Sequence, residues 1–139
     1  MRVLIDTNIV LDVLLKREPY YKHSQLVLLA AEEQYIYGYI SASAITDIFY
    51  VTNKALKSTT ETYALLKNLI NTITVAAVDN EIITGALESD WDDFEDCVQY
   101  YVGESVDVDY IVTRNPADFF SGEISTMLPE ALLNLIAPE

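Results

Sequence analysis

The sequence predicts a single α/β domain over residues 1–139, a three-layer α/β/α arrangement with a central, mostly parallel sheet of four to five strands. Short apolar runs rich in β-branched residues alternate along the chain with longer segments of helical periodicity. Strands separated by helices pair in parallel through right-handed crossovers, and the helices then cover both faces of the sheet. No linker, repeat or low-complexity segment divides the 139 residues, a length that fits one domain.

The first half of the chain is expected to alternate strands with helices that have clear boundary residues. The opening run RVLID is apolar and β-branched, and the helical pattern that follows it is stopped by Pro19. Ser41 and Ser43 are suitable N-caps for a later helix. The expected elements are a strand at 2–6, helices at 7–16 and 20–34, a strand at 35–40, and helices at 44–56 and 59–72.

The second half continues the alternation. The run ITVAAV is interpreted as a buried strand, Asp79 as the cap of the next helix, and Pro129 suits the first position of the last helix. The expected elements are strands at 73–78 and 109–113, a short edge strand at 125–128, helices at 80–89, from the acidic stretch to about 102, and at 129–136, and a loop over 113–120.

Composition and charge exclude several classes of function. One Cys and one His rule out an internal disulfide framework and a Cys/His zinc site, and the lone Cys suits a reducing cytoplasm. No apolar run approaches the length of a membrane span, and the N-terminus has no signal-peptide layout. The net charge is −14, and residues 79–139 contain fifteen acids and only one base, Arg114. A protein of this charge needs a divalent cation before it can handle a polyanion.

Polar residues follow two of the expected strands. Asp6 ends the first strand, and Asn115 and Asp118 follow the strand at 109–113. Ligands of open α/β sheets bind beyond the carboxyl ends of the strands, so these residues share one crevice if the two strands are neighbours. For Asp6 alone, a helix N-cap explains the residue equally well.

Asp47 is a second candidate ligand, because it lies in the helix at 44–56 with Ile45, Ile48 and Phe49 around it. A carboxylate among apolar neighbours is costly to desolvate unless it is paired or bound to a metal. The alternative is that Asp47 lies on the solvent-facing stripe of an amphipathic helix.

The stretch SDWDDFEDCVQYY (89–101) contains five carboxylates within seven positions. The residues at helical spacing that are expected to face the core are Trp91, Phe94, Val98 and Tyr101. Asp92, Asp93 and Glu95 then fall in the first turn, where acids interact favourably with the helix dipole. Asp96 lies beyond that turn, and Asp93 stands three residues before it, so both could approach one ion. Asp96, with Asp93, is therefore the candidate ligand of this stretch.

Four motifs together resemble those of the PIN-domain nucleases, over nearly the whole chain and in family order. They are VLIDTNIVLDVLL, SASAITDIFYV, DWDDFEDCVQYY and DYIVTRNPADF. The pair TDIFYV and DFEDCVQYY is similar to a bacterial or archaeal branch, the toxins of toxin–antitoxin pairs. The resemblance implies a PIN-like, Rossmann-like fold and a hydrolase that cuts RNA phosphodiesters with Mg²⁺ or Mn²⁺.

The resemblance also assigns roles to residues. The metal-binding and catalytic acids would be Asp6, Asp47 and Asp96. Thr7 and Asn8 would stand at the edge of the metal, and Thr113 would orient a carboxylate or water. Many relatives carry Glu at the position of Asp47 and Asp at the position of Asn115. The fourth acid would then be Asp118 or Asp93.

The chemistry agrees with the residue types, since Mg²⁺ prefers oxygen ligands, keeps several waters and activates one of them as the nucleophile. Lys16, Arg17 and Arg114 lie in loops near the strand ends, where each either contacts phosphate or is an ordinary solvated charge. Asp12 is interpreted as a solvated break in an apolar helix or, less favoured, as a group behind the metal ligands. His23 is expected to be an exposed helix residue.

The sequence thus favours an endoribonuclease of the PIN type, a toxin-like cytoplasmic homodimer whose acidic half suits a basic antitoxin segment. A PIN-like module that binds RNA or protein without cutting is the alternative, because of Asp47, Asn115 and the overall acidity. Aspartate-nucleophile phosphatases also begin with Asp at a strand end, but they need a second Asp where this chain has Asn8.

Overall fold

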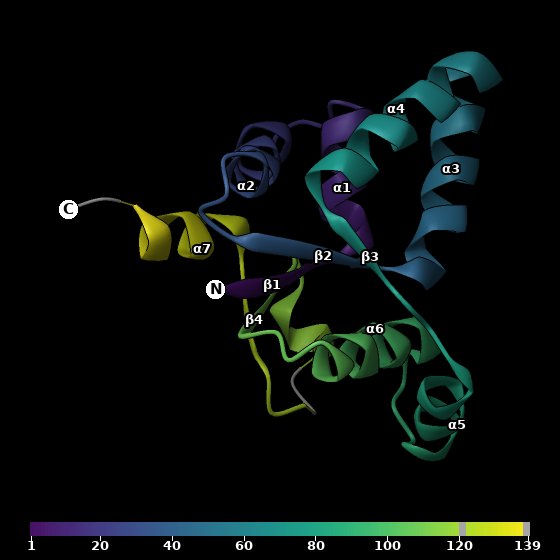
Figure 1. Cartoon of the computed structure of the whole chain (residues 1–139), viewed down its shortest axis with the longest axis vertical. Coiled ribbons are helices and arrows are strands. Elements are labelled where there is room, and N and C mark those ends of the chain that lie inside the picture. Colours follow the sequence, from purple (N-terminus) through teal and green to yellow (C-terminus); the bar gives the residue numbers. More distant parts are fainter. Residues whose placement is uncertain (120–121, 138–139) are drawn as a thin grey trace.

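The computed structural model describes residues 1–119 and 122–137 and contains a five-stranded sheet in the order β3-β2-β1-β4-β5. Every pairing in the sheet is parallel. Helices α1 to α4 lie on one side of the sheet and α5 and α6 on the other, which confirms the three-layer α/β/α expectation (Figure 1). The connection between β3 and β4 crosses to the opposite side of β1, so the strand order reverses between β1 and β4.

The bounds of most elements agree with the sequence expectations to within a few residues. The strands are β1 (Arg2–Ile5), β2 (Tyr37–Ser41), β3 (Thr74–Ala76), β4 (Tyr110–Val112) and β5 (Ser125–Met127). The helices are α1 (Thr7–Leu14), α2 (Tyr21–Glu32), α3 (Ala42–Leu56), α4 (Thr59–Thr72), α5 (Asn80–Glu88), α6 (Phe94–Ser105) and α7 (Pro129–Ile136). The expected loop over 113–120 contains a 3-10 helix, Pro116–Phe119, and its last residue lies outside the described residues.

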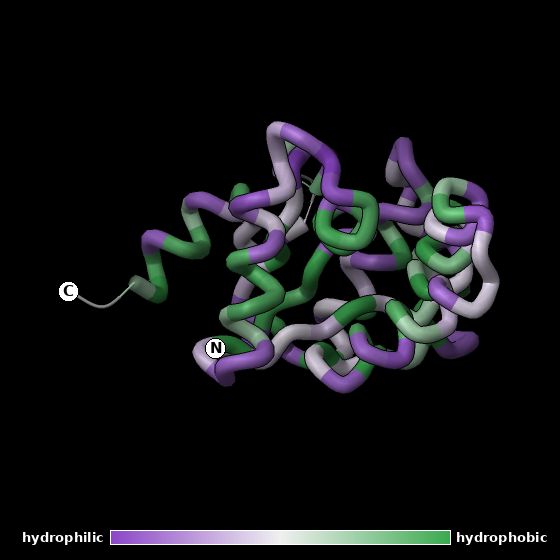
Figure 2. Tube along the Cα trace, turned by 90° about the horizontal axis from the view of Figure 1, so that it is seen from above, coloured by the Kyte–Doolittle hydropathy of each residue, from purple (hydrophilic) through white to green (hydrophobic). Residues whose placement is uncertain are grey.

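Two hydrophobic cores flank the sheet because successive strand residues point to opposite faces. Val3 and Ile5 of β1 pack with α1 to α4 and α7, whereas Leu4 packs with α5 and α6. Gly38 of β2 is required by close packing, since a Cβ there would lie 2.9 Å from Ile73 Cγ2 and 3.1 Å from Ile5 Cδ1. The hydropathy trace is hydrophilic at many outer turns, and α7 alternates between the two colours (Figure 2).

Side-chain caps start the helices that surround the sheet. Ser41 caps α3 by accepting a hydrogen bond from the Ser43 amide, and Ser58 caps α4. Asp79 caps α5 by accepting from the Ile82 amide at 2.9 Å. The caps at Ser41 and Asp79 confirm the sequence expectation.

The expectation of a buried strand over 73–78 is wrong. β3 covers three residues at the edge of the sheet, Val75 is 39% exposed, and only Ala76 of the strand is buried. The run is apolar, but it has a neighbouring strand on one side only, so apolar content did not distinguish an edge strand from a central one.

The acidic stretch also differs from its expected placement. α6 begins at Phe94 with Asp93 as its N-cap, so Trp91 lies before the helix. Phe94 was expected to face the core, yet it is 46% exposed. Trp91 instead reaches the core from the loop, where its ring centroid lies 5.2 Å from that of Tyr100. Among the described residues, no helix is both long and apolar enough to cross a bilayer.

Candidate metal centre at the carboxyl ends of the strands

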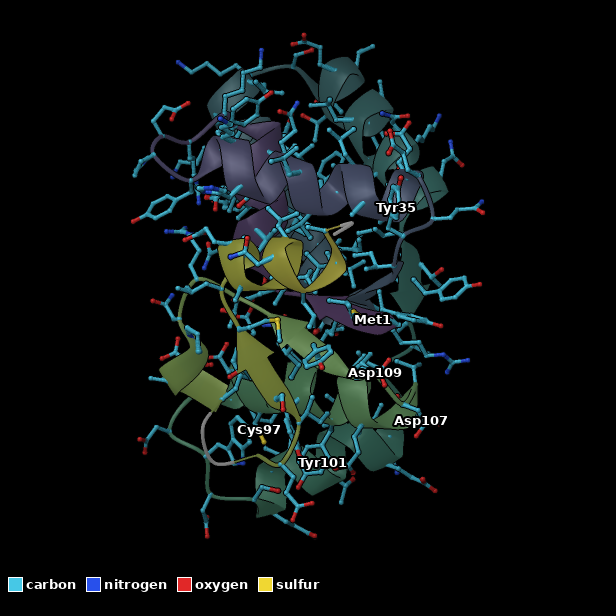
Figure 3. The ribbon with its side chains drawn as sticks, turned by 90° about the vertical axis from the view of Figure 1, so that its left-hand side faces the viewer. Met1, Tyr35, Cys97, Tyr101, Asp107 and Asp109 are labelled. Atoms are coloured by element: carbon cyan, nitrogen blue, oxygen red, sulfur yellow. The ribbon has the colours of Figure 1, made fainter. Side chains whose placement is uncertain are left out.

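The carboxyl ends of β1, β4 and β5 form one row. Ile5 is in register with Val112, and Val112 with Met127. One residue further on, the Asp6 amide donates to the Val112 carbonyl at 3.0 Å and the Thr113 amide to the Met127 carbonyl at 2.9 Å. The strands that carry Asp6 and Thr113 are therefore direct neighbours at the point where the strand order reverses, as the crevice hypothesis requires. Met1 and Asp109 lie at the other end of these strands, just before β1 and β4 begin (Figure 3).

Asp6 occupies the N-cap position of α1, but its side chain makes no cap hydrogen bond. Its carboxylate turns to the other face of the sheet, where Gln99 Nε2 donates to Oδ1 at 3.1 Å and Thr113 Oγ1 donates to Oδ2 at 2.8 Å. Asp6 and both partners are buried. The capping alternative therefore fails for this side chain, because both of its oxygens are directed at α6 and β4 instead.

Asp96 lies in the first turn of α6, where the charge of Asp6 and those of other acids act on it. Its pKa is raised from 3.8 to about 7, first by burial and then by the negative charges of Asp93, Asp6, Asp118 and Glu95. Asp93 caps the helix by accepting from the Asp96 amide at 3.0 Å, so one of its oxygens is already in use. The four neighbours come from three separate parts of the chain, which places β1, α6 and the 3-10 helix around Asp96.

Glu95 is a member of this cluster that sequence reasoning assigned only to the helix start. Burial raises its pKa first, and the negative charges of Asp47 and Asp93 raise it further. The acid of α3, Asp47, is exposed, and its carboxylate lies close enough to that of Glu95 for the two charges to interact. Its exposure supports the solvent-facing alternative for its own position, but its charge acts on Glu95 and so links it to the acids of α6.

Three buried side chains next to Asp6 carry polar oxygens, of which two have no hydrogen-bond partner among the described residues and one supports Asp6. Thr7 Oγ1 and Gln99 Oε1 are buried and have no hydrogen-bond partner in the part of the chain that the structure describes. Thr113 Oγ1, which holds Asp6, also accepts from the Asn115 amide at 3.1 Å. Asn8 is half-buried beside Thr7, whereas Asn115 and Asp118 are exposed. Gln99 was missed by sequence reasoning, and its only signal was a polar residue within the buried face of α6.

The donor set consists of oxygens alone, which suits a hard divalent cation. Within residues 1–119 and 122–137, however, no three His, Cys, Asp or Glu side chains converge closely enough to enclose an ion together. The raised pKa of Asp96 gives a physical reason, since unneutralised carboxylates repel one another. Asp47, Asp93 and Asp118 are exposed, and Asp93 is held as the cap of α6. The set therefore fits a cation that draws Asp47 and Asp118 towards Asp6 and Asp96.

A family model described as PIN domain matches residues 2–117. The chain belongs to the PIN domain family. The matched residues include Asp6, Asp47, Asp93, Glu95 and Asp96, and Asp118 lies one residue beyond them.

Solved structures share this PIN fold at low sequence identity. The crystal structure of FitAcB from Neisseria gonorrhoeae matches with a TM-score of 0.64 and 13% identity, over 92% of this chain and 98% of that one. The structure of FitAB bound to an IR36 DNA fragment matches with a TM-score of 0.54 and 13% identity, over 99% and 97% of the two chains. At this identity the likeness shows the fold alone. A comparison with curated proteins found no match.

Arg114, the only basic residue of the acidic segment 79–139, forms an ion pair with Asp12. Arg114 Nε lies 3.0 Å from Asp12 Oδ2, although its N–H is poorly aligned for a hydrogen bond, and its guanidinium stacks 3.9 Å above the Tyr20 ring centroid. Asp12 is fully buried and also accepts from Ser24 Oγ at 3.2 Å. The expectation that Asp12 is a solvated break was therefore wrong, because a partner far along the chain compensates its charge.

The other two basic candidates differ from Arg114. Lys16 is exposed in a left-handed backbone conformation with φ of 52°, and Arg17 is half-buried with its charge acting on Asp12. His23 is exposed, as expected, and its Nδ1 lies 3.6 Å from Glu130 Oε1.

Proposed function

We propose that this PIN domain is a metal-dependent endoribonuclease that hydrolyses RNA phosphodiesters with Mg²⁺ or Mn²⁺. Members of the family are typically nucleases that use divalent ions. The observation that carries the proposal is the clamped carboxylate of Asp6 facing Asp96, whose pKa is raised to about 7 by burial and by four neighbouring acids. Acids that gather around the buried carboxylate of Asp6 repel one another, and a bound divalent cation would relieve this repulsion.

The residues have separate tasks in this proposal. Asp6 is a ligand whose position is set by Gln99 and Thr113, and Asp96 is the ligand opposite it. A divalent ion bound there would lower the pKa of a water, polarise the scissile phosphate and offset the charge of the site. The exposed acids Asp47 and Asp118, together with Asp93, supply further oxygens, and the longer side chain of Glu95 adds a carboxylate near the short Asp47.

The biological setting is part of the same proposal. The sequence resembles the toxins of toxin–antitoxin pairs, so we propose a toxin-like cytoplasmic protein that forms a homodimer and binds a basic antitoxin segment. The fifteen acids of residues 79–139 give such a segment a complementary surface. One of the two similar structures, FitAB, is bound to DNA, and for that reason DNA belongs among the substrates to be tested.

The test is cleavage of a single-stranded RNA with Mn²⁺ or Mg²⁺ by the wild type and by Asp6→Asn and Asp96→Asn. Asp107→Asn is the matched control, because it removes one exposed carboxylate near the amino ends of the strands, away from the proposed metal centre (Figure 3). We expect cleavage by the wild type and control, and a loss of at least about 100-fold in both site variants.

Equal cleavage by all four proteins would mean a contaminating nuclease. No cleavage by the wild type, with RNA still bound, would favour the alternative of a non-cutting PIN module. Two residues favour that alternative. Asp47 is shorter than the Glu that many relatives carry at this position, and Asn115 is an amide where many carry Asp.

A further inference from the structure

A pocket of about 320 Å³ opens on the α1 and α2 side of the sheet. Its apolar wall is formed by Pro19, Leu128 and Pro129, and polar atoms come from Tyr20, His23 and Arg114. The volume falls in the usual range of small-molecule sites, and a mainly apolar wall with a few polar groups is their usual composition. None of the acids assigned to the metal centre lines this pocket.

The pocket lies on the same row of strand ends as the acids. Thr113 holds Asp6, and Arg114 is the next residue along the chain. The Thr113 amide is bonded to Met127, which leads directly to Leu128 in the pocket wall. Neighbouring strands are about 4.8 Å apart, so the end of β5 lies about 10 Å across the sheet from that of β1. One nucleic-acid strand crossing this edge can contact both places.

Arg114 is held so that part of its guanidinium remains available. Asp12 takes the Nε side at 3.0 Å, and Tyr20 covers one face of the planar group. Among the described residues, no hydrogen bond is made by its terminal nitrogens, and the side chain is 21% exposed. An arginine fixed by a buried carboxylate and an aromatic ring has already lost most of its rotamer freedom, so it can bind a ligand with little further entropy cost.

We propose that this pocket receives a nucleobase of the RNA strand that is cut at Asp6 and Asp96. The terminal N–H groups of Arg114 donate to oxygen or nitrogen acceptors on the edge of the base, while Leu128 and Pro129 contact its ring. A base fits better than a phosphate, because Asp12 already neutralises the charge of Arg114 and Glu130 also lines the pocket. This inference rests on the proposed function, whose substrate preference it would set.

The single histidine makes the pocket directly observable. His23 lines it and is the only His in the chain, so its ring gives one isolated set of NMR signals. We would titrate a short single-stranded RNA of mixed sequence into the protein at fixed pH, with Ca²⁺ present to neutralise the acids. The expected result is a saturable shift of the His23 ring signals in the wild type and in the cleavage-deficient Asp96→Asn.

Two variants block the pocket in different ways. Leu128→Trp fills it, and Tyr20→Leu removes the aromatic support of Arg114 at an exposed position that folding should tolerate. We expect each to weaken RNA binding about tenfold, measured by fluorescence anisotropy, and Leu128→Trp to abolish the His23 shift. Leu135→Trp, on the exposed part of α7 outside the pocket, is the matched control and should bind as the wild type does.

Cleavage enters only as a separate readout. A His23 shift without RNA cleavage would refute the proposed nuclease and support the pocket as an RNA-binding site. Cleavage without a His23 shift, or a shift and affinity that persist in both pocket variants, would overturn the inference. No RNA binding at all would overturn it as well.

Discussion

Replacing Asp96 by Asn should stabilise the metal-free protein at pH 8. The folded state raises the pKa of Asp96 from 3.8 to about 7, so at pH 8 folding holds a charged carboxylate in a partly buried place beside four other acids. A shift of this size has a ceiling of about 4 kcal/mol at about 1.36 kcal/mol per pKa unit. Because the side chain is partly exposed and its neighbours are screened by water and salt, we expect about 1 to 2 kcal/mol.

The sign follows from the direction of the shift. The pKa of Asp96 is higher in the folded than in the unfolded state, so the folded protein retains a proton that the unfolded chain has already lost. The stabilising contribution is complete below about pH 4, decreases as the pH rises, and is gone above about pH 7. The free energy of unfolding of the wild type should therefore fall over this interval more steeply than that of Asp96→Asn.

Urea unfolding at pH 5, 6, 7 and 8 in the presence of EDTA measures this difference. Asp107→Asn corrects for the loss of one negative charge from a protein of net charge −14. Replacing EDTA by Mn²⁺ should stabilise the wild type at pH 8 more than Asp96→Asn, because only the wild type keeps the ligand. Equal pH profiles for the wild type and Asp96→Asn in EDTA would refute the reasoning that the acids repel one another at this site.

Three further substitutions test the structure around the centre. Arg114→Met leaves Asp12 buried without its partner and should cost about 3 to 5 kcal/mol of stability in urea unfolding, with partial recovery when Asp12→Leu is added. Gln99→Met removes the donor to Asp6 Oδ1 and should lower Mn²⁺ affinity about 10- to 100-fold in calorimetric titration, whereas an unchanged affinity would exclude a positioning role. Gly38→Ala should cost about 1 to 3 kcal/mol by thermal unfolding, since its Cβ would crowd the core, and an unchanged melting temperature would show that the neighbouring side chains can yield.

The fold was predictable from local features because each level of the sequence agrees with the next. The apolar run RVLI, the cap at Ser41 and the proline at position 129 each mark a boundary that the structure has within about two residues. The rule for ligands at strand ends also predicted that Asp6 shares a crevice with the residues after the strand at 109–113 if the two strands are neighbours, and β1 and β4 are neighbours. Local patterning decided these features, so a single sequence was enough.

The supporting residues of the centre could not be predicted for the opposite reason. Gln99 meets Asp6 across 93 positions of sequence, and nothing near either residue marks the contact. Asp12 appeared to be a polar break in an apolar helix because its compensating charge, Arg114, comes from the other end of the chain. Glu95 was explained fully by the dipole of its own helix until α3 was placed beside it. Periodicity reports which face is buried but not which polar partner is buried with it.

The centre divides into a fixed half and an adjustable half, and this division explains how an acidic site can stay folded before an ion binds. Asp6 is buried, but two hydrogen bonds satisfy its charge, so its position costs little to maintain. Asp47 and Asp118 are exposed to water, where their charges have no desolvation penalty. Fixing each of them on an ion costs only about 1 kcal/mol of side-chain entropy. Asp96 carries the largest uncompensated cost of the centre, which its pKa of about 7 records, and Glu95 has a raised pKa as well. A divalent ion that neutralises Asp96 finds the Asp6 carboxylate already in position, and the exposed acids join it last. The metal affinity should therefore depend most on Asp6 and Asp96 and least on Asp47 and Asp118.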